Sequence, residues 1–68
     1  MNKPETAQFR VSYSKPQPAQ PIIDRLRRSG LESVTLLRGR MTESDAWYML
    51  EVSGTPRTIR AALQLTGA

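Results

Sequence analysis

The stretch ESVTLLRGRMTESDAWYMLEVSG, residues 32–54, decides the fold. Residues 32–41 are rich in β-branched and aliphatic side chains and predict a strand. Residues 42–45 are polar and turn-like, and residues 46–52 predict another strand. Because so short a turn separates them, the two strands should form an antiparallel hairpin. Gly39 interrupts the first of them and predicts a β-bulge, or a close approach by another backbone or a ligand.

Helix signals stand on both sides of this hairpin. Pro21 suits the first position of a helix, and Gly30 suits the left-handed residue after its end. Thr55-Pro56 repeats the helix-start pattern, and Gly67 would stop the second helix. The expected buried stripes are Ile22, Ile23 and Leu26 in the first helix, and Ile59, Ala62 and Leu63 in the second.

The N-terminal part adds one more strand. Phe9, Val11 and Tyr13 alternate with polar residues from Gln8 onward, which is the period of a half-buried strand. Residues 15–20 contain two prolines, which cannot continue the strand, so we expect a stiff connecting loop there. Residues 1–7 lack periodicity and predict a flexible N-terminus, and 68 residues leave room for a single domain, residues 8–68.

The order β-α-β-β-α predicts the α+β class. The expected layout is a ferredoxin-like split βαβ, an antiparallel sheet with both helices on one face. In the first strand of the hairpin, simple alternation places Val34 and Leu36 on one face of the sheet and Leu37 and Met41 on the other face. In the second strand it places Tyr48, Leu50 and Val52 on one face and Trp47 and Met49 on the other. Both sheet faces would then be apolar, so we expect a homo-oligomer, a dimer, formed through the helix-free face or a sheet edge. The expected interface residues are Leu37, Met41, Trp47 and Met49.

The composition argues against an enzyme. The chain has no cysteine and no histidine, which excludes disulfides, thiolate or imidazole metal sites and nucleophile–base pairs that need either residue. Glu43 and Asp45 are the closest carboxylate pair, far short of the six to eight oxygens that Ca²⁺ takes. Acid–base chemistry would rest on these or on Glu51 without a visible partner. We therefore expect no metal, no cofactor and no catalytic residue.

The charge balance is basic, with ten Lys+Arg against six Asp+Glu and a net charge of +4. Eight of the ten cations are arginine, which binds phosphate or carboxylate in a bidentate manner, so an anionic partner fits; arginines spread over every element also fit a solvated surface. The sequence has no apolar run of bilayer length and no signal-peptide pattern, which predicts a cytoplasmic protein without membrane insertion.

A family resemblance rests on four segments, residues 21–26, 34–39, 49–54 and 59–63. Their order and spacing resemble the NIL domain, an ACT-like regulatory module known at the C-terminus of bacterial methionine-transporter ATPases, where it pairs and binds methionine. It also occurs as small free-standing or ferredoxin-linked proteins in cyanobacteria. The Asn-Ile-Leu tripeptide of the family corresponds here to Thr35-Leu36-Leu37. The family usually ends in a fourth strand, whereas this sequence stops after the second predicted helix. The final strand is therefore expected to be missing, and the edge beside the first strand is expected to be open to a partner or another copy.

The resemblance implies a non-catalytic regulatory or adaptor module that binds an amino-acid-like metabolite or a partner protein through a paired sheet interface. The expected ligand residues are Lys15, Gln17, Gln20, Arg38 and Gly39. One alternative is RNA binding, with Tyr13, Trp47 and Tyr48 as stacking surfaces. Another is a structural protein–protein scaffold that docks through the open edge or the apolar face.

Overall fold

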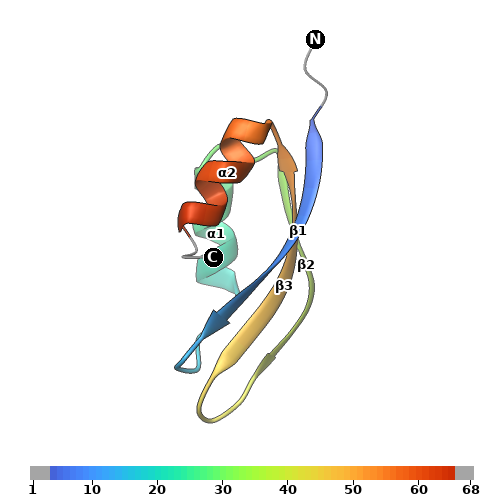
Figure 1. The fold of residues 1–68 in the computed structure, drawn as a ribbon. Coiled ribbons are helices and arrows are strands. Elements are labelled where there is room, and N and C mark those ends of the chain that lie inside the picture. Colours follow the sequence, from blue (N-terminus) through green and yellow to red (C-terminus); the bar gives the residue numbers. More distant parts are fainter. Residues whose placement is uncertain (1–3, 66–68) are drawn as a thin grey trace.

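The structure is a computed structural model that describes residues 4–65. Three strands and two helices follow one another in the predicted order (Figure 1). Their bounds are β1 (Glu5–Tyr13), α1 (Gln20–Arg28), β2 (Ser33–Met41), β3 (Ala46–Gly54) and α2 (Pro56–Leu65). The α+β class and the ferredoxin-like split βαβ arrangement are confirmed.

The sheet has the strand order β1-β3-β2, with β3 antiparallel to both neighbours. α1 therefore connects two parallel strands across the inserted β3, which is the split βαβ topology. Both helices lie on the same side of the sheet (Figure 1). The fourth strand with which the NIL family ends would pair beside β1, and residues 4–65 contain no strand there.

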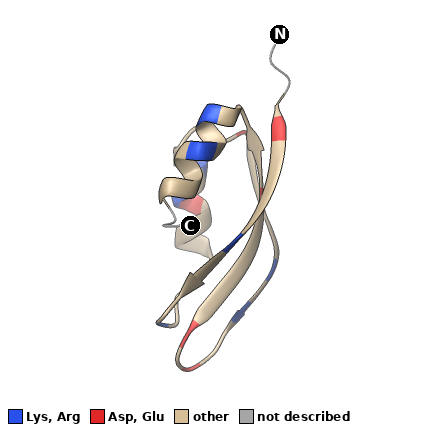
Figure 2. Ribbon diagram, in the orientation of Figure 1, with Lys and Arg blue, Asp and Glu red and all other residues tan. Residues whose placement is uncertain are grey.

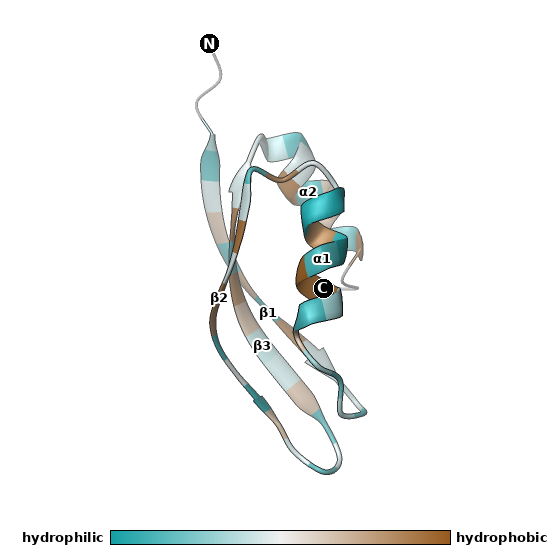
Figure 3. Cartoon of the chain, turned by 180° about the vertical axis from the view of Figure 1, so that it is seen from behind, coloured by the Kyte–Doolittle hydropathy of each residue, from teal (hydrophilic) through white to brown (hydrophobic). Residues whose placement is uncertain are grey.

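The core fills the space between the helices and one face of the sheet. Alternate residues of β3 are buried, and the hydrophobic positions of the helices turn toward them (Figure 3). The buried residues are Val11, Ile23, Leu26, Leu31, Val34, Ala46, Tyr48, Leu50, Val52, Ile59 and Ala62. Both predicted helix stripes are confirmed, with Ile22 and Leu63 half-buried at their margins.

The helix ends follow local chemistry. Gly30 adopts φ 100, the left-handed conformation that glycine enters at low cost, directly after the C-cap Ser29 of α1. The Thr55 hydroxyl accepts a hydrogen bond of 3.2 Å from the Thr58 N–H at the start of α2. Gly67, the expected stop of the second helix, lies outside the described residues.

β1 begins earlier than the sequence pattern indicates. The assignment of residues 1–7 to a flexible terminus is wrong for Glu5, Thr6 and Ala7, which pair with Gly54, Ser53 and Val52 of β3. β3 likewise runs on to Gly54, beyond the predicted end at Val52. The two extensions support each other, because each provides the hydrogen-bonding partners of the other. Residues 1–3 lie outside the described part of the chain.

Candidate functional site

The expected ligand residues do not converge on one place. Lys15 and Gln17 lie exposed in the loop between β1 and α1, and Gln20 opens α1, where its amide donates to Asp24 Oδ1 at 2.8 Å. Arg38 pairs with Met49 and Gly39 with Tyr48, so consecutive residues of β2 point to opposite sheet faces. The structure thus divides this set between the two faces of the sheet.

Gly39 has a packing role. Its neighbour across the ladder, Tyr48, is 6% exposed, and the Tyr48 hydroxyl donates a hydrogen bond to the Gln17 carbonyl. A Cβ atom built on Gly39 would lie 2.9 Å from the Trp47 carbonyl oxygen and 3.0 Å from Tyr48 Cε1, and closer still to Cδ1. The sequence predicted a close approach by another backbone or a ligand, whereas the structure places the Tyr48 ring closest to this glycine, with the Trp47 carbonyl next.

The β-bulge is not at Gly39 but at Leu37. Leu36 pairs with Leu50 and Arg38 with Met49, so Leu37 is the extra residue on β2. An extra residue reverses the side on which every later side chain of the strand lies. Arg38 and Arg40 consequently join the helix-free face, while Met41 turns to the helix side, opposite Ala46.

The expectation that both faces are apolar is therefore wrong. Leu37 and Met41, expected to share an apolar face, are 44% and 56% exposed, and Met41 pairs on the helix side. The helix-free face is defined by the residues that the register places opposite the core. They are Thr6, Gln8, Arg10 and Ser12 of β1, Trp47, Met49, Glu51 and Ser53 of β3, and Ser33, Thr35, Arg38 and Arg40 of β2. Most of this face is polar.

Among the residues that the register places on that face, Trp47 and Met49 are the large apolar side chains, and three arginines lie beside them. In one row of the sheet Met49 lies between Arg10 and Arg38, and in the next Trp47 lies between Ser12 and Arg40. Trp47 and Met49 are half-buried and all three arginines are exposed. We call Arg10, Arg38, Arg40, Trp47 and Met49 the arginine–tryptophan site. It is the largest concentration of cations on the described sheet, although the helices carry arginines too (Figure 2).

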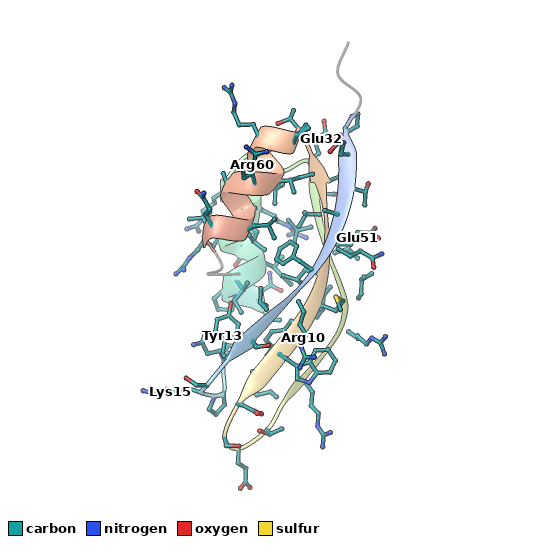
Figure 4. The ribbon with its side chains drawn as sticks, in the orientation of Figure 1. Arg10, Tyr13, Lys15, Glu32, Glu51 and Arg60 are labelled. Atoms are coloured by element: carbon teal, nitrogen blue, oxygen red, sulfur yellow. The ribbon has the colours of Figure 1, made fainter. Side chains whose placement is uncertain are left out.

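The Arg10 guanidinium stacks on the indole, with its Cζ atom 4.7 Å from the centre of the Trp47 ring. A cation over an indole face at this distance is a favourable cation–π arrangement. Arg10 and Glu51 point away from the helices (Figure 4), and Glu51 accepts a hydrogen bond of 2.9 Å from Gln8 Nε2. This carboxylate is thereby engaged one row away, while the arginines keep donors free for an anion.

On the helix side of the sheet, the pKa of Tyr13 is raised. Burial raises the pKa of Tyr13 above its ordinary value of 10.0; the Arg25 guanidinium opposes this shift, and Tyr48 adds to it. Tyr13 points toward the helix side of the sheet (Figure 4). Tyr13 and the buried Tyr48 therefore belong to the helix side, and neither forms the exposed stacking surface that the RNA alternative expected.

A separate hollow of about 400 Å³ lies along α1, and its lining is Gln20, Pro21, Asp24, Arg25 and Arg28. All of these residues come from one helix, so no second element closes the hollow. Gln20 contributes to it, but its amide is already bonded to Asp24.

Two residues of the arginine–tryptophan site, Arg10 and Arg40, were not predicted from the sequence. Alternation in β1 marks Arg10 as facing away from the core, whereas Arg40 gives no signal, because its side depends on the bulge.

No family model, curated protein or solved structure matches the chain. The resemblance to the NIL domain therefore stays a prediction. Within residues 4–65, neither α1 nor α2 is long and apolar enough to cross a bilayer.

Proposed function

We propose that this protein is a non-catalytic, cytoplasmic binding module whose helix-free sheet face binds single-stranded RNA. The observation that carries the proposal is the position of Trp47 and Met49 on the central strand between Arg10, Arg38 and Arg40. Bases of single-stranded nucleic acid stack on aromatic rings and on arginine planes, and phosphates take bidentate arginine contacts. One small face offers both kinds of contact.

The proposed RNA binding differs from the amino-acid binding that the NIL resemblance implies. Two observations favour RNA. The Tyr48 ring occupies the space beside Gly39, and Arg38 lies on the opposite face of the sheet from that ring. The expected ligand residues therefore form no common pocket. The arginine–tryptophan site, in contrast, is continuous across neighbouring strands. An anionic, aromatic-rich ligand matches its chemistry better than a zwitterionic amino acid does.

Trp47 is the only tryptophan of the chain, so it reports directly on the site. Titration with a mixed-sequence single-stranded RNA oligonucleotide should quench its fluorescence as a base stacks against the indole or displaces Arg10. If the three arginines each contact one phosphate, the logarithm of the association constant should fall with log salt at a slope of about −2. An undetectable or salt-insensitive interaction would refute the proposal.

A charge-matched pair of variants separates a site from general attraction. Arg10→Gln, Arg38→Gln and Arg40→Gln together remove three charges from the helix-free face. The control variant carries Arg27→Gln, Arg57→Gln and Arg60→Gln, three exposed positions on the helices. We expect the first variant to lose at least tenfold in affinity and the control to lose much less. Equal losses would mean that net charge alone attracts RNA.

Calorimetric titration with free amino acids tests the metabolite reading in the same samples. Heat and thermal stabilisation on amino-acid addition, without RNA quenching, would replace the RNA proposal with the regulatory one. Co-purification with a defined complex would instead favour the scaffold reading.

A further inference from the structure

The outer edge of β1 is unpaired among the described residues, because β1 and β2 are the outer strands of the order β1-β3-β2. Two hydrogen bonds establish which β1 groups face outward. Thr42 N–H donates to the Asp45 carbonyl at 2.9 Å, and Glu32 N–H donates to the Ser53 carbonyl at 2.8 Å. Asp45, directly before β3, and Ser53, near its end, therefore direct their carbonyl groups toward β2, and the odd-numbered residues between them do the same.

Backbone groups alternate along a strand, so the even-numbered residues of β3 direct theirs toward β1. The register pairs these with the odd-numbered residues of β1, Phe9 with Leu50 for example. The even-numbered residues of β1 must then point their N–H and C=O groups away from the sheet. These residues are Thr6, Gln8, Arg10 and Ser12, and all four are exposed.

Apart from the charge of Arg10, no feature of β1 opposes pairing with a further strand. Proteins usually protect a sheet edge with a proline, a bulge or a very short strand. β1 has nine residues, no proline between Glu5 and Tyr13, and no register shift against β3. β2, the other edge, carries the bulge at Leu37. The open β1 edge is thus suited to backbone pairing.

We propose that β1 pairs antiparallel with β1 of a second copy, about a two-fold axis at Phe9. In this register Gln8 faces the partner's Arg10, and Thr6 faces the partner's Ser12. Each of the four outward residues then uses its N–H and its C=O. On the helix side Phe9 meets the partner's Phe9, and Ala7 meets the partner's Val11, so both contacts extend the core. No like charges oppose each other in any of these pairs.

The neighbouring two-fold registers are worse. Shifting the axis to Arg10 places two guanidinium groups directly opposite each other, which is destabilising. Shifting it to Gln8 places Ser12 opposite the partner's Pro4, which has no N–H to donate. Of these three registers, the Phe9 register is the one without opposed guanidinium groups and without a proline in the ladder.

Pairing produces a six-stranded sheet with all helices on one face and two arginine–tryptophan sites on the other. Strand spacings of about 4.8 Å and about 3.4 Å per residue place the two Trp47 side chains about 25 Å apart. The partner's Gln8 then lies beside Arg10, so the second copy contributes a polar group next to each site. This pairing does not rest on RNA binding.

Cysteine cross-linking tests the register, because the chain has no cysteine of its own. In Phe9→Cys the two thiols face each other across a closely spaced pair, so mild oxidation should produce a covalent dimer. In Thr6→Cys the two Cα atoms are about 20 Å apart along the strands, so the same oxidation should leave monomers. Equal cross-linking of both variants, or none in either, overturns the proposed register.

Sedimentation provides a second measurement that does not depend on a cysteine. At a protein concentration of tens of micromolar, sedimentation of the unmodified chain should give a molecular mass of twice 7.6 kDa. Gln8→Pro removes an outward N–H while leaving the ladder to β3 intact, and should sediment at 7.6 kDa with an unchanged circular dichroism spectrum. Gln8→Ala keeps the N–H and should stay dimeric. A folded, unmodified monomer overturns the pairing, whereas a dimer that binds no RNA overturns only the proposed function.

Discussion

Replacing Gly39 with alanine should destabilise the protein through the Tyr48 ring. The added methyl group would lie 2.9 Å from the Trp47 carbonyl oxygen and 3.0 Å from Tyr48 Cε1, where carbon contacts prefer about 3.5–4.0 Å. The ring has little room to move, since it is 6% exposed and its hydroxyl is bonded to the Gln17 carbonyl. The strain therefore has to be absorbed by the core.

The magnitude follows from two opposing effects. Overpacking a core typically costs about 1–3 kcal/mol. Alanine also restricts the unfolded chain, which stabilises by about 0.4–1 kcal/mol. The net loss should be about 1–2 kcal/mol in the free energy of unfolding, or a decrease in Tm of about 5–15 °C for a domain of this size. Urea titration followed by circular dichroism measures it directly.

A double-mutant cycle identifies the cause. In a Tyr48→Leu background the ring is absent, so Gly39→Ala should cost less than about 0.5 kcal/mol or become stabilising. A ligand-approach role predicts a different pattern, in which Gly39→Ala folds as stably as the unmodified protein and loses only binding. Equal destabilisation in both backgrounds would show that Tyr48 does not explain this glycine.

Two further predictions concern the bulge and the alkaline limit of stability. Deleting Leu37 joins the Leu36–Leu50 and Arg38–Met49 pairs in regular register, so RNA quenching should persist and the free energy of unfolding should change by less than about 1 kcal/mol; lost quenching would contradict the assigned register. The pKa of Tyr13 is raised in the folded state, so its contribution is complete below pH 10.0 and is lost as pH rises through the folded-state pKa. Tyr13→Phe should flatten that decline in urea titrations between about pH 9 and 11, and an unchanged decline would refute the assignment.

The element order was predictable because its signals are local. Pro21 and Gly30 bracket α1, Thr55-Pro56 starts α2, and the period of two in residues 8–14 marks β1. These features act within a few residues of themselves, so they need no knowledge of the fold. The start of β1 and the end of β3 were less predictable from the sequence, because residues 5–7 form a strand by pairing with residues 52–54, far away along the chain.

The composition of the helix-free face was not predictable from alternation. A bulge is a property of two paired strands, and the sequence of β2 alone offers Gly39 as its apparent site rather than Leu37. With a bulge at Gly39, Arg38 would lie on the helix side, and without any bulge Arg38 and Arg40 would both lie there. With the bulge at Leu37, both lie on the helix-free face beside Trp47 and Met49. One extra residue thus converts an expected apolar dimer surface into a basic one.

That conversion also changes where a second copy can bind. A face carrying Arg10, Arg38 and Arg40 would set like charges against each other if two copies met face to face, which disfavours such a dimer. The same bulge interrupts the β2 edge. Edge pairing through β1 avoids both obstacles, because its outward groups are backbone amides and carbonyls. It also leaves the arginine–tryptophan site uncovered, so the proposed self-association and the proposed RNA binding would not compete for the same surface.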